Sequence, residues 1–130
     1  MLNTATIQEF DAGLPAVYAF RIVDRVTSDD MAEMSRRMND VFDNTSHKVD
    51  MLLVFETERE SEPGAGFSKD AITAQFKSLT NVGNYVVANA PGQAGALVES
   101  MGKAMPVEAR AFATESEAKV WLKSHGTKAA

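Results

Sequence analysis

The stretch VDMLLVFE, residues 49–56, decides the fold class of this chain. A strand with one wet face alternates apolar and polar side chains, but the centre of this stretch is almost continuously apolar. Such a run indicates a strand buried on both faces, as in a parallel sheet covered by helices. We therefore expect helices to alternate with strands along the rest of the chain.

Two segments before this stretch predict an antiparallel hairpin. Residues 4–10 fit a short strand, and residues 16–23, rich in Val, Tyr, Phe and Ile, fit a second one. Between them, Asp11, Ala12 and Gly13 have the composition of a turn. The hairpin adds two strands to the sheet.

The segment after the hairpin has the period of an amphipathic helix. Thr27 or Ser28 is its predicted N-cap, and Glu33 and Arg37 are spaced for an ion pair on the wet side. We interpret its apolar stripe as core packing; the alternative is an adaptable wall for an apolar ligand, because methionine repacks easily. The stripe consists of Met31, Met34, Met38, Val41 and Phe42.

Strands and helices alternate after residue 56 as well. Residues 84–89 and 107–112 fit strands, and further helices are expected to begin at Ser68 and Pro91. The resulting order is ββαβαβαβα. It predicts an α/β fold with a mixed, mostly parallel five-stranded sheet covered by helices.

The last predicted helix begins with a capping box. In the stretch TESE, residues 114–117, the hydroxyl of Thr114 caps the helix and the carboxylate of Glu117 reaches back. Ala118, Trp121 and Leu122 follow at a spacing that turns them inward.

Composition sets the broad class. The chain has 130 residues, 45% of them hydrophobic, which suits one domain over residues 1–125 with a flexible tail at residues 126–130. Its net charge of −5 disfavours nucleic acid as a partner. The absence of cysteine excludes disulfides, thiolate metal sites and a cysteine nucleophile. With no secretion signal and no apolar run long enough to span a bilayer, we expect a cytoplasmic protein.

The most suggestive site candidate is GAGFSK, residues 64–69, which follows a predicted strand and opens a predicted helix. Ser68, Lys69 and the free amides of a helix start suit an anionic head group. Phe67 lies in this glycine-rich loop, and Phe55 and Phe76 would extend an apolar wall. The alternative is a flexible loop followed by an ordinary N-cap.

Two other groups of polar residues carry weaker signals. Four glutamates alternate from Glu56 to Glu62, which suits a divalent cation or, more simply, a solvated acidic edge. His47 and His125 lie at predicted element ends, and neither neighbours a Gly-x-Ser-x-Gly motif. We expect no catalytic residue, no metal site and no cofactor.

Four stretches together resemble the SpoIIAA-like proteins of the STAS superfamily. They are VDMLLVFE at 49–56, NYVVA at 84–88, VEARAF at 107–112 and EAKVWL at 117–122. The resemblance implies a small bacterial domain whose fold is shared with the CRAL-TRIO lipid-binding domains. In anti-sigma-factor antagonists of this family, a phosphorylatable serine follows an aspartate at a helix start. Ser68 stands at the comparable position here, but Phe67 precedes it in place of the aspartate.

The resemblance and the residues lead to two function hypotheses. The first is a non-enzymatic module that binds an apolar or amphiphilic, lipid-like molecule near the carboxyl ends of the parallel strands, where open α/β sheets bind ligands. The second is a regulatory module that binds a protein partner. The sequence leaves open a homodimer, the strand order, and phosphorylation of Ser68.

Overall fold

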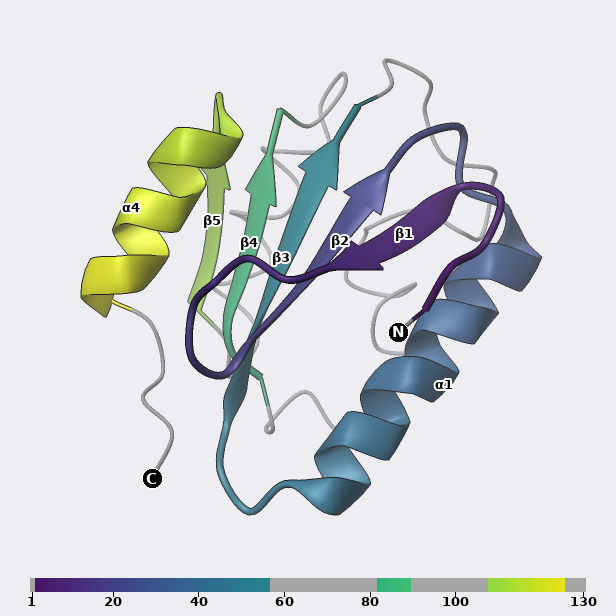
Figure 1. Cartoon of the computed structure of the whole chain (residues 1–130), viewed down its shortest axis with the longest axis horizontal. Helices are drawn as coiled ribbons and strands as arrows, with labels where there is room; N and C mark the ends of the chain where they lie inside the picture. The colour runs from purple at the N-terminus through teal and green to yellow at the C-terminus, as the bar shows by residue number, and fades with distance from the viewer. Residues whose placement is uncertain (1, 57–81, 90–107, 126–130) are drawn as a thin grey trace.

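The computed structural model describes residues 2–56, 82–89 and 108–125. Within these ranges, one sheet of five strands packs against two helices (Figure 1). The helices expected at Ser68 and Pro91 lie outside the described residues. The elements are β1 (Ile7–Phe10), β2 (Val17–Ile22), α1 (Ser28–Asn44), β3 (Val49–Phe55), β4 (Val82–Ala88), β5 (Glu108–Phe112) and α4 (Glu115–His125).

The sheet has the predicted mixed character. Its strand order is β1-β2-β3-β4-β5, in which β1 pairs antiparallel with β2 and every other pair is parallel. All seven residues of β3 are buried, which confirms the interpretation of residues 49–56 as a strand covered on both faces. The carboxyl ends of β2 to β5 lie along one side of the sheet, which we call the carboxyl edge.

The two faces of the sheet carry separate cores. Met51, Leu53 and Phe55 of β3 contribute to the core beneath α1, while Leu52 and Val54 contribute to the core beneath α4. This alternation follows from the two-residue period of a strand. In Figure 1, α4 lies next to β5 and α1 lies on the other side of the sheet.

Helix α1 begins and packs as its sequence predicts. Thr27 is the N-cap, and its Oγ1 accepts a hydrogen bond of 3.2 Å from the backbone N–H of Asp30. Met31, Met34 and Met38 are at most 1% exposed, and Val41 and Phe42 are also buried. Their burial in the core supports the core-packing interpretation of the methionine stripe.

The prediction of an ion pair between Glu33 and Arg37 is wrong. Arg37 instead donates from Nε and Nη2 to the carboxylate of Glu9 in β1, at 2.9 and 3.1 Å, while Glu33 pairs with Arg36. The Glu9 side chain is 4% exposed and also accepts from the N–H of Leu2. Burial disfavours its charged form, but the bonds from Arg37 and Leu2 outweigh burial and lower the pKa of Glu9.

Tyr85 places a polar group inside the core beneath α1. The residue is 1% exposed, and its hydroxyl has no hydrogen-bond partner within the part of the chain that the structure describes. Burial raises the pKa of this phenol, because the phenolate is poorly solvated there. The hydroxyl therefore stays neutral, and it makes no hydrogen bond with the residues that the structure describes.

Candidate functional site

Asn89 links three strands at the carboxyl edge through hydrogen bonds. It follows β4 with a φ of 55°, a left-handed conformation that asparagine tolerates better than most residues. Its Nδ2 donates to the carbonyl oxygen of Phe55 at 3.0 Å, and its backbone N–H donates to that of Phe112 at 3.0 Å. The ends of β3, β4 and β5 are therefore held at fixed positions.

A cluster of charges fastens the start of α4 to the sheet. Arg21 Nη1 lies 2.7 Å from Glu115 Oε1 and 3.3 Å from Glu56 Oε1, and Lys119 Nζ lies 2.6 Å from Glu115 Oε2. The bonds from Arg21 and then Lys119 lower the pKa of Glu115. The guanidinium of Arg21 also lies 4.1 Å from the ring centroid of Phe10. Glu56 thus pairs with Arg21. The other three glutamates of the alternating series, between residues 58 and 62, lie outside the described residues.

A second set of bonds holds the end of α4. The side chain of Asn84 in β4 donates to the carbonyl oxygen of His125 at 3.3 Å. Asn84 is itself oriented by Asp50, whose Oδ1 accepts from both its N–H and its Nδ2 at 3.0 Å. Asp50 is fully buried. Both ends of α4 are therefore anchored to the sheet, so its outer side chains project from a fixed support.

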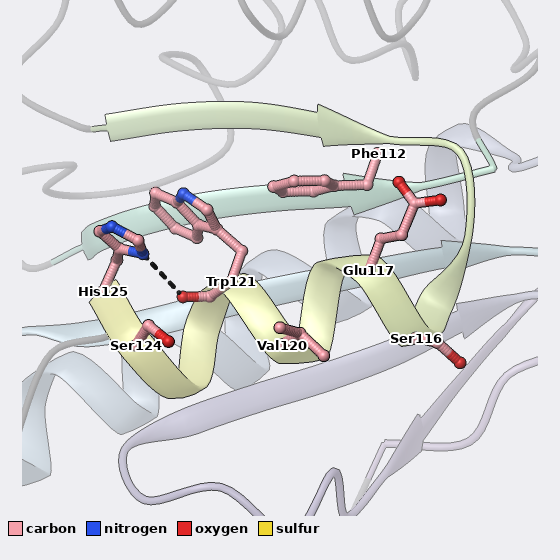
Figure 2. A pocket seen from close by; sticks show the side chains of 7 residues that line it. All are labelled: Phe112, Ser116, Glu117, Val120, Trp121, Ser124 and His125. Carbon is pink, nitrogen blue, oxygen red and sulfur yellow. Dashed lines mark hydrogen bonds between the residues drawn. The ribbon is translucent and has the colours of Figure 1, made fainter.

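A pocket of about 510 Å³ lies along α4 and the end of β5 (Figure 2). Its volume falls within the range of small-molecule sites, about 300–1,000 Å³. Residues of α4 one turn apart form one side, and Phe112 at the end of β5 forms the other. The lining consists of Phe112, Ser116, Glu117, Val120, Trp121, Ser124 and His125.

Three aromatic rings form the apolar wall of this pocket. The rings of Trp121 and His125 are stacked, with centroids 4.9 Å apart and an interplanar angle of 12°, and the centroids of Phe112 and Trp121 are 6.0 Å apart. His125 Nδ1 lies 3.2 Å from the carbonyl oxygen of Trp121. Because a carbonyl only accepts, Nδ1 carries the hydrogen, and in the neutral ring Nε2 is an acceptor.

The capping box of α4 forms only in part. Thr114 Oγ1 accepts a hydrogen bond of 3.2 Å from the N–H of Glu117, as predicted. The carboxylate of Glu117 does not complete the box: it makes no hydrogen bond or ion pair with the described residues. Figure 2 shows this side chain directed from α4 toward Phe112, at the rim of the pocket.

Of the sequence-predicted site residues, Phe55 is the one within the described ranges, and it does not line this pocket. Phe55 is 3% exposed and belongs to the core beneath α1. Phe67, Ser68, Lys69 and Phe76 lie outside the described residues, so the site predicted there stays a prediction.

The sequence analysis missed the pocket because it predicted that Trp121 faces the core together with Ala118 and Leu122. Ala118 and Leu122 are indeed buried, but Trp121 is half-buried and lines the pocket. The available signal was the Trp121–His125 spacing of four residues, which stacks two rings on one side of a helix.

The described residues give no geometry for metal binding. No group of three His, Asp or Glu side chains among them is close enough to hold an ion. The second histidine, His47, bonds through Nδ1 to the carbonyl oxygen of Lys48 at 2.9 Å. No helix in the described ranges is both long and apolar enough to cross a membrane.

The fold is that of an α/β domain with a mostly parallel sheet, and the helix that follows its last strand is bonded to the sheet at both ends. The family model for SpoIIAA-like proteins matches residues 17–123, and the chain therefore belongs to the SpoIIAA-like family. The comparisons with curated proteins and with solved structures find no match. The family assignment confirms the resemblance of the four stretches described above.

Proposed function

We propose that this chain is a non-enzymatic SpoIIAA-like module that binds an apolar or amphiphilic small molecule in the pocket between β5 and α4. The observation that carries the proposal is the wall of Phe112, Trp121 and His125 rings beside a volume of about 510 Å³. The pocket begins at the carboxyl edge, where open α/β sheets commonly bind ligands.

The chemistry of the lining favours reversible binding. An apolar chain lying against the rings and Val120 would remove water from both surfaces, at roughly 25 cal/mol per Å² of apolar area. The hydroxyls of Ser116 and Ser124 supply hydrogen-bonding groups at the rim. Anchoring of α4 at both ends supports a pre-formed wall, which lowers the entropic cost of binding.

The site predicted around Phe67, Ser68 and Lys69 is a separate prediction on the same module. It requires a cationic side chain and helix amides for an anionic head group. A Lys69→Gln variant tests it, because this change removes the cation that an anionic head group would contact.

A second candidate function is a regulatory module that binds a protein partner. Val120 favours it, because this apolar side chain of α4 is 67% exposed. Exposed apolar residues next to aromatic rings are common in the centres of protein interfaces. Native mass spectrometry separates the two: a retained small-molecule mass supports the first, and a ligand-free chain retained with a second protein supports the second.

Trp121 makes the first proposal directly testable, because it is the single tryptophan of the chain. We expect 1-octanol to change its fluorescence in a saturable way. Val120→Glu adds a charge beside the rings and should weaken this response several-fold. Gln8→Glu adds the same charge at an exposed position of β1 and should leave the response unchanged. A response that never saturates, or one that both variants weaken equally, would overturn the proposal.

A further inference from the structure

We infer that the pocket between β5 and α4 selects ligands with an ammonium head group over ligands with a carboxylate. The inference rests on the proposed function and names the ligand class of the same site. It is carried by the charges, hydrogen-bond acceptors and rings that surround the pocket.

The first observation is the sign of the charge that lines the pocket. Glu117 is the one acidic side chain among the lining residues in the described ranges, and no lysine or arginine of those ranges lines the pocket. The two lysines of α4 lie outside the lining, and Lys119 is engaged by Glu115. A carboxylate head group would meet like charge here, whereas an ammonium would meet an opposite charge.

The second observation is that the carboxylate of Glu117 is not used by the helix. A glutamate at the third position after the N-cap can bond back to the cap, and Thr114 provides the other half of that motif. Instead, Glu117 is directed toward Phe112 and has no partner among the described residues. The carboxylate therefore remains available to a cation at the rim.

The third observation concerns the other end of the pocket. The Nδ1–H of His125 bonds to the carbonyl oxygen of Trp121, so Nε2 of the neutral ring accepts rather than donates. Ser124 and His125 also lie in the last turn of α4, where the helix dipole places partial negative charge. Both features favour a donor or cation over an anion.

The fourth observation is the ring system itself. Aromatic faces attract cations through their quadrupole. The guanidinium of Arg110 already lies 6.0 Å from the ring centroid of Trp121, which places a cation near this ring within the chain. Arg110 does not line the pocket, but it is the cation that opposes the inference. The test must therefore distinguish its influence from that of Glu117.

Three ligands with the same alkyl chain separate the head-group preference from apolar binding. At neutral pH, 1-octanol is neutral, octylammonium is cationic and octanoate is anionic. Each ligand is titrated into the protein while the fluorescence of Trp121 is recorded. We expect octylammonium to bind about threefold to tenfold more tightly than octanol, as one exposed ion pair and one cation–π contact allow. Octanoate should bind more weakly than octanol.

Variants identify the group responsible. Glu117→Gln should remove the ion-pair part of the preference for octylammonium and leave the cation–π part, without changing octanol binding. Glu33→Gln removes the same charge from an exposed position of α1 and should leave the preference intact. The urea midpoint of each variant, compared with that of the parent, verifies the fold.

The outcomes distinguish failure of the head-group preference from failure of the proposed function. If octanol binds but octanoate binds equally well or more tightly, the head-group preference is overturned while the proposed function stands. If both Glu117→Gln and Glu33→Gln abolish the preference for octylammonium, the preference arises from the net charge of the protein, and the inference is also overturned. If none of the three ligands gives a saturable response, both the proposed function and the inference fail.

Discussion

The two faces of the sheet differ in how completely the described helix on each one buries its apolar side chains. Beneath α1 the face is closed: Met31, Met34 and Met38 are at most 1% exposed. On the α4 side, Trp121 is half-buried and Val120 is 67% exposed. Among the described residues, the α1 face therefore carries the larger core, whereas the α4 face combines a smaller core with exposed apolar surface.

The difference follows from the helices themselves. Helix α1 has 17 residues and buries six of them, while α4 has 11 residues and buries Ala118 and Leu122. A narrow buried stripe leaves the aromatic side chains of α4 at its margin, where they meet Phe112 of β5. The pocket is thus a consequence of a short helix with a narrow apolar stripe.

The largest expected effect is the loss of packing beneath α1. Met34→Ala should lower the free energy of unfolding by about 2–5 kcal/mol, because Met34 is fully buried and its removal leaves a cavity. Met34→Leu nearly conserves volume and should cost less than about 1.5 kcal/mol. Urea unfolding measures both. An equally large loss for Trp121→Leu would contradict the division between the two faces.

The next largest effect is the stability lost when a paired carboxylate is replaced, and it can be compared between Glu9 in β1 and Glu115 in α4. Glu9→Gln should cost about 1–3 kcal/mol, because it leaves Arg37 without its nearly buried partner. Glu115→Gln removes a more exposed partner of Arg21 and should cost about 1 kcal/mol or less. Urea unfolding at neutral pH ranks the two; the reverse ranking would contradict the account.

The same two carboxylates predict the acid response. Each has its pKa lowered from the usual value of 4.5, so the folded state binds fewer protons than the unfolded state in that range. Their contribution to stability is therefore complete above the unfolded pKa and disappears as the pH falls through the folded one. Stability measured from neutral pH downward should decline below about pH 4.5, less steeply in either variant.

Much of the fold was predictable from local patterns. The continuous run of β3 and the methionine spacing of α1 each indicate burial without knowledge of the neighbours. A strand buried on both faces requires helices on both faces, so one stretch of sequence constrains the whole architecture.

The supports of the pocket were not predictable in this way. Asp50 interrupts an apolar run, and it is buried where its carboxylate accepts hydrogen bonds from Asn84, 34 residues away. Asn84 in turn bonds to His125, a further 41 residues along the chain. Helical spacing indicated that Trp121 faces the sheet, but how deeply it is buried depends on β5.

A smaller effect tests the unpartnered hydroxyl beneath α1. Tyr85→Phe removes a buried polar group that has no partner among the described residues. The free energy of unfolding should stay unchanged or rise by up to about 1 kcal/mol. Thermal or urea unfolding measures the change. A loss greater than about 1 kcal/mol would show that this hydroxyl contributes a stabilising bond.

The smallest effect on stability is expected on the open face. Val120→Ser should change the free energy of unfolding by less than about 0.5 kcal/mol, because the side chain is mostly exposed. The same change should weaken octanol binding, as it removes apolar contact area. A stability loss comparable to that of Met34→Ala would mean that Val120 is covered by another part of the chain.

Amide and indole NMR signals recorded during a titration with 1-octanol test the central claim most directly. We predict that signals of Trp121, Val120 and His125 shift together and saturate, while those of Met34 and Met38 on the closed face stay in place. Shifts confined to the α1 face, with the indole signal of Trp121 unmoved, would contradict the assignment of binding to the pocket between β5 and α4.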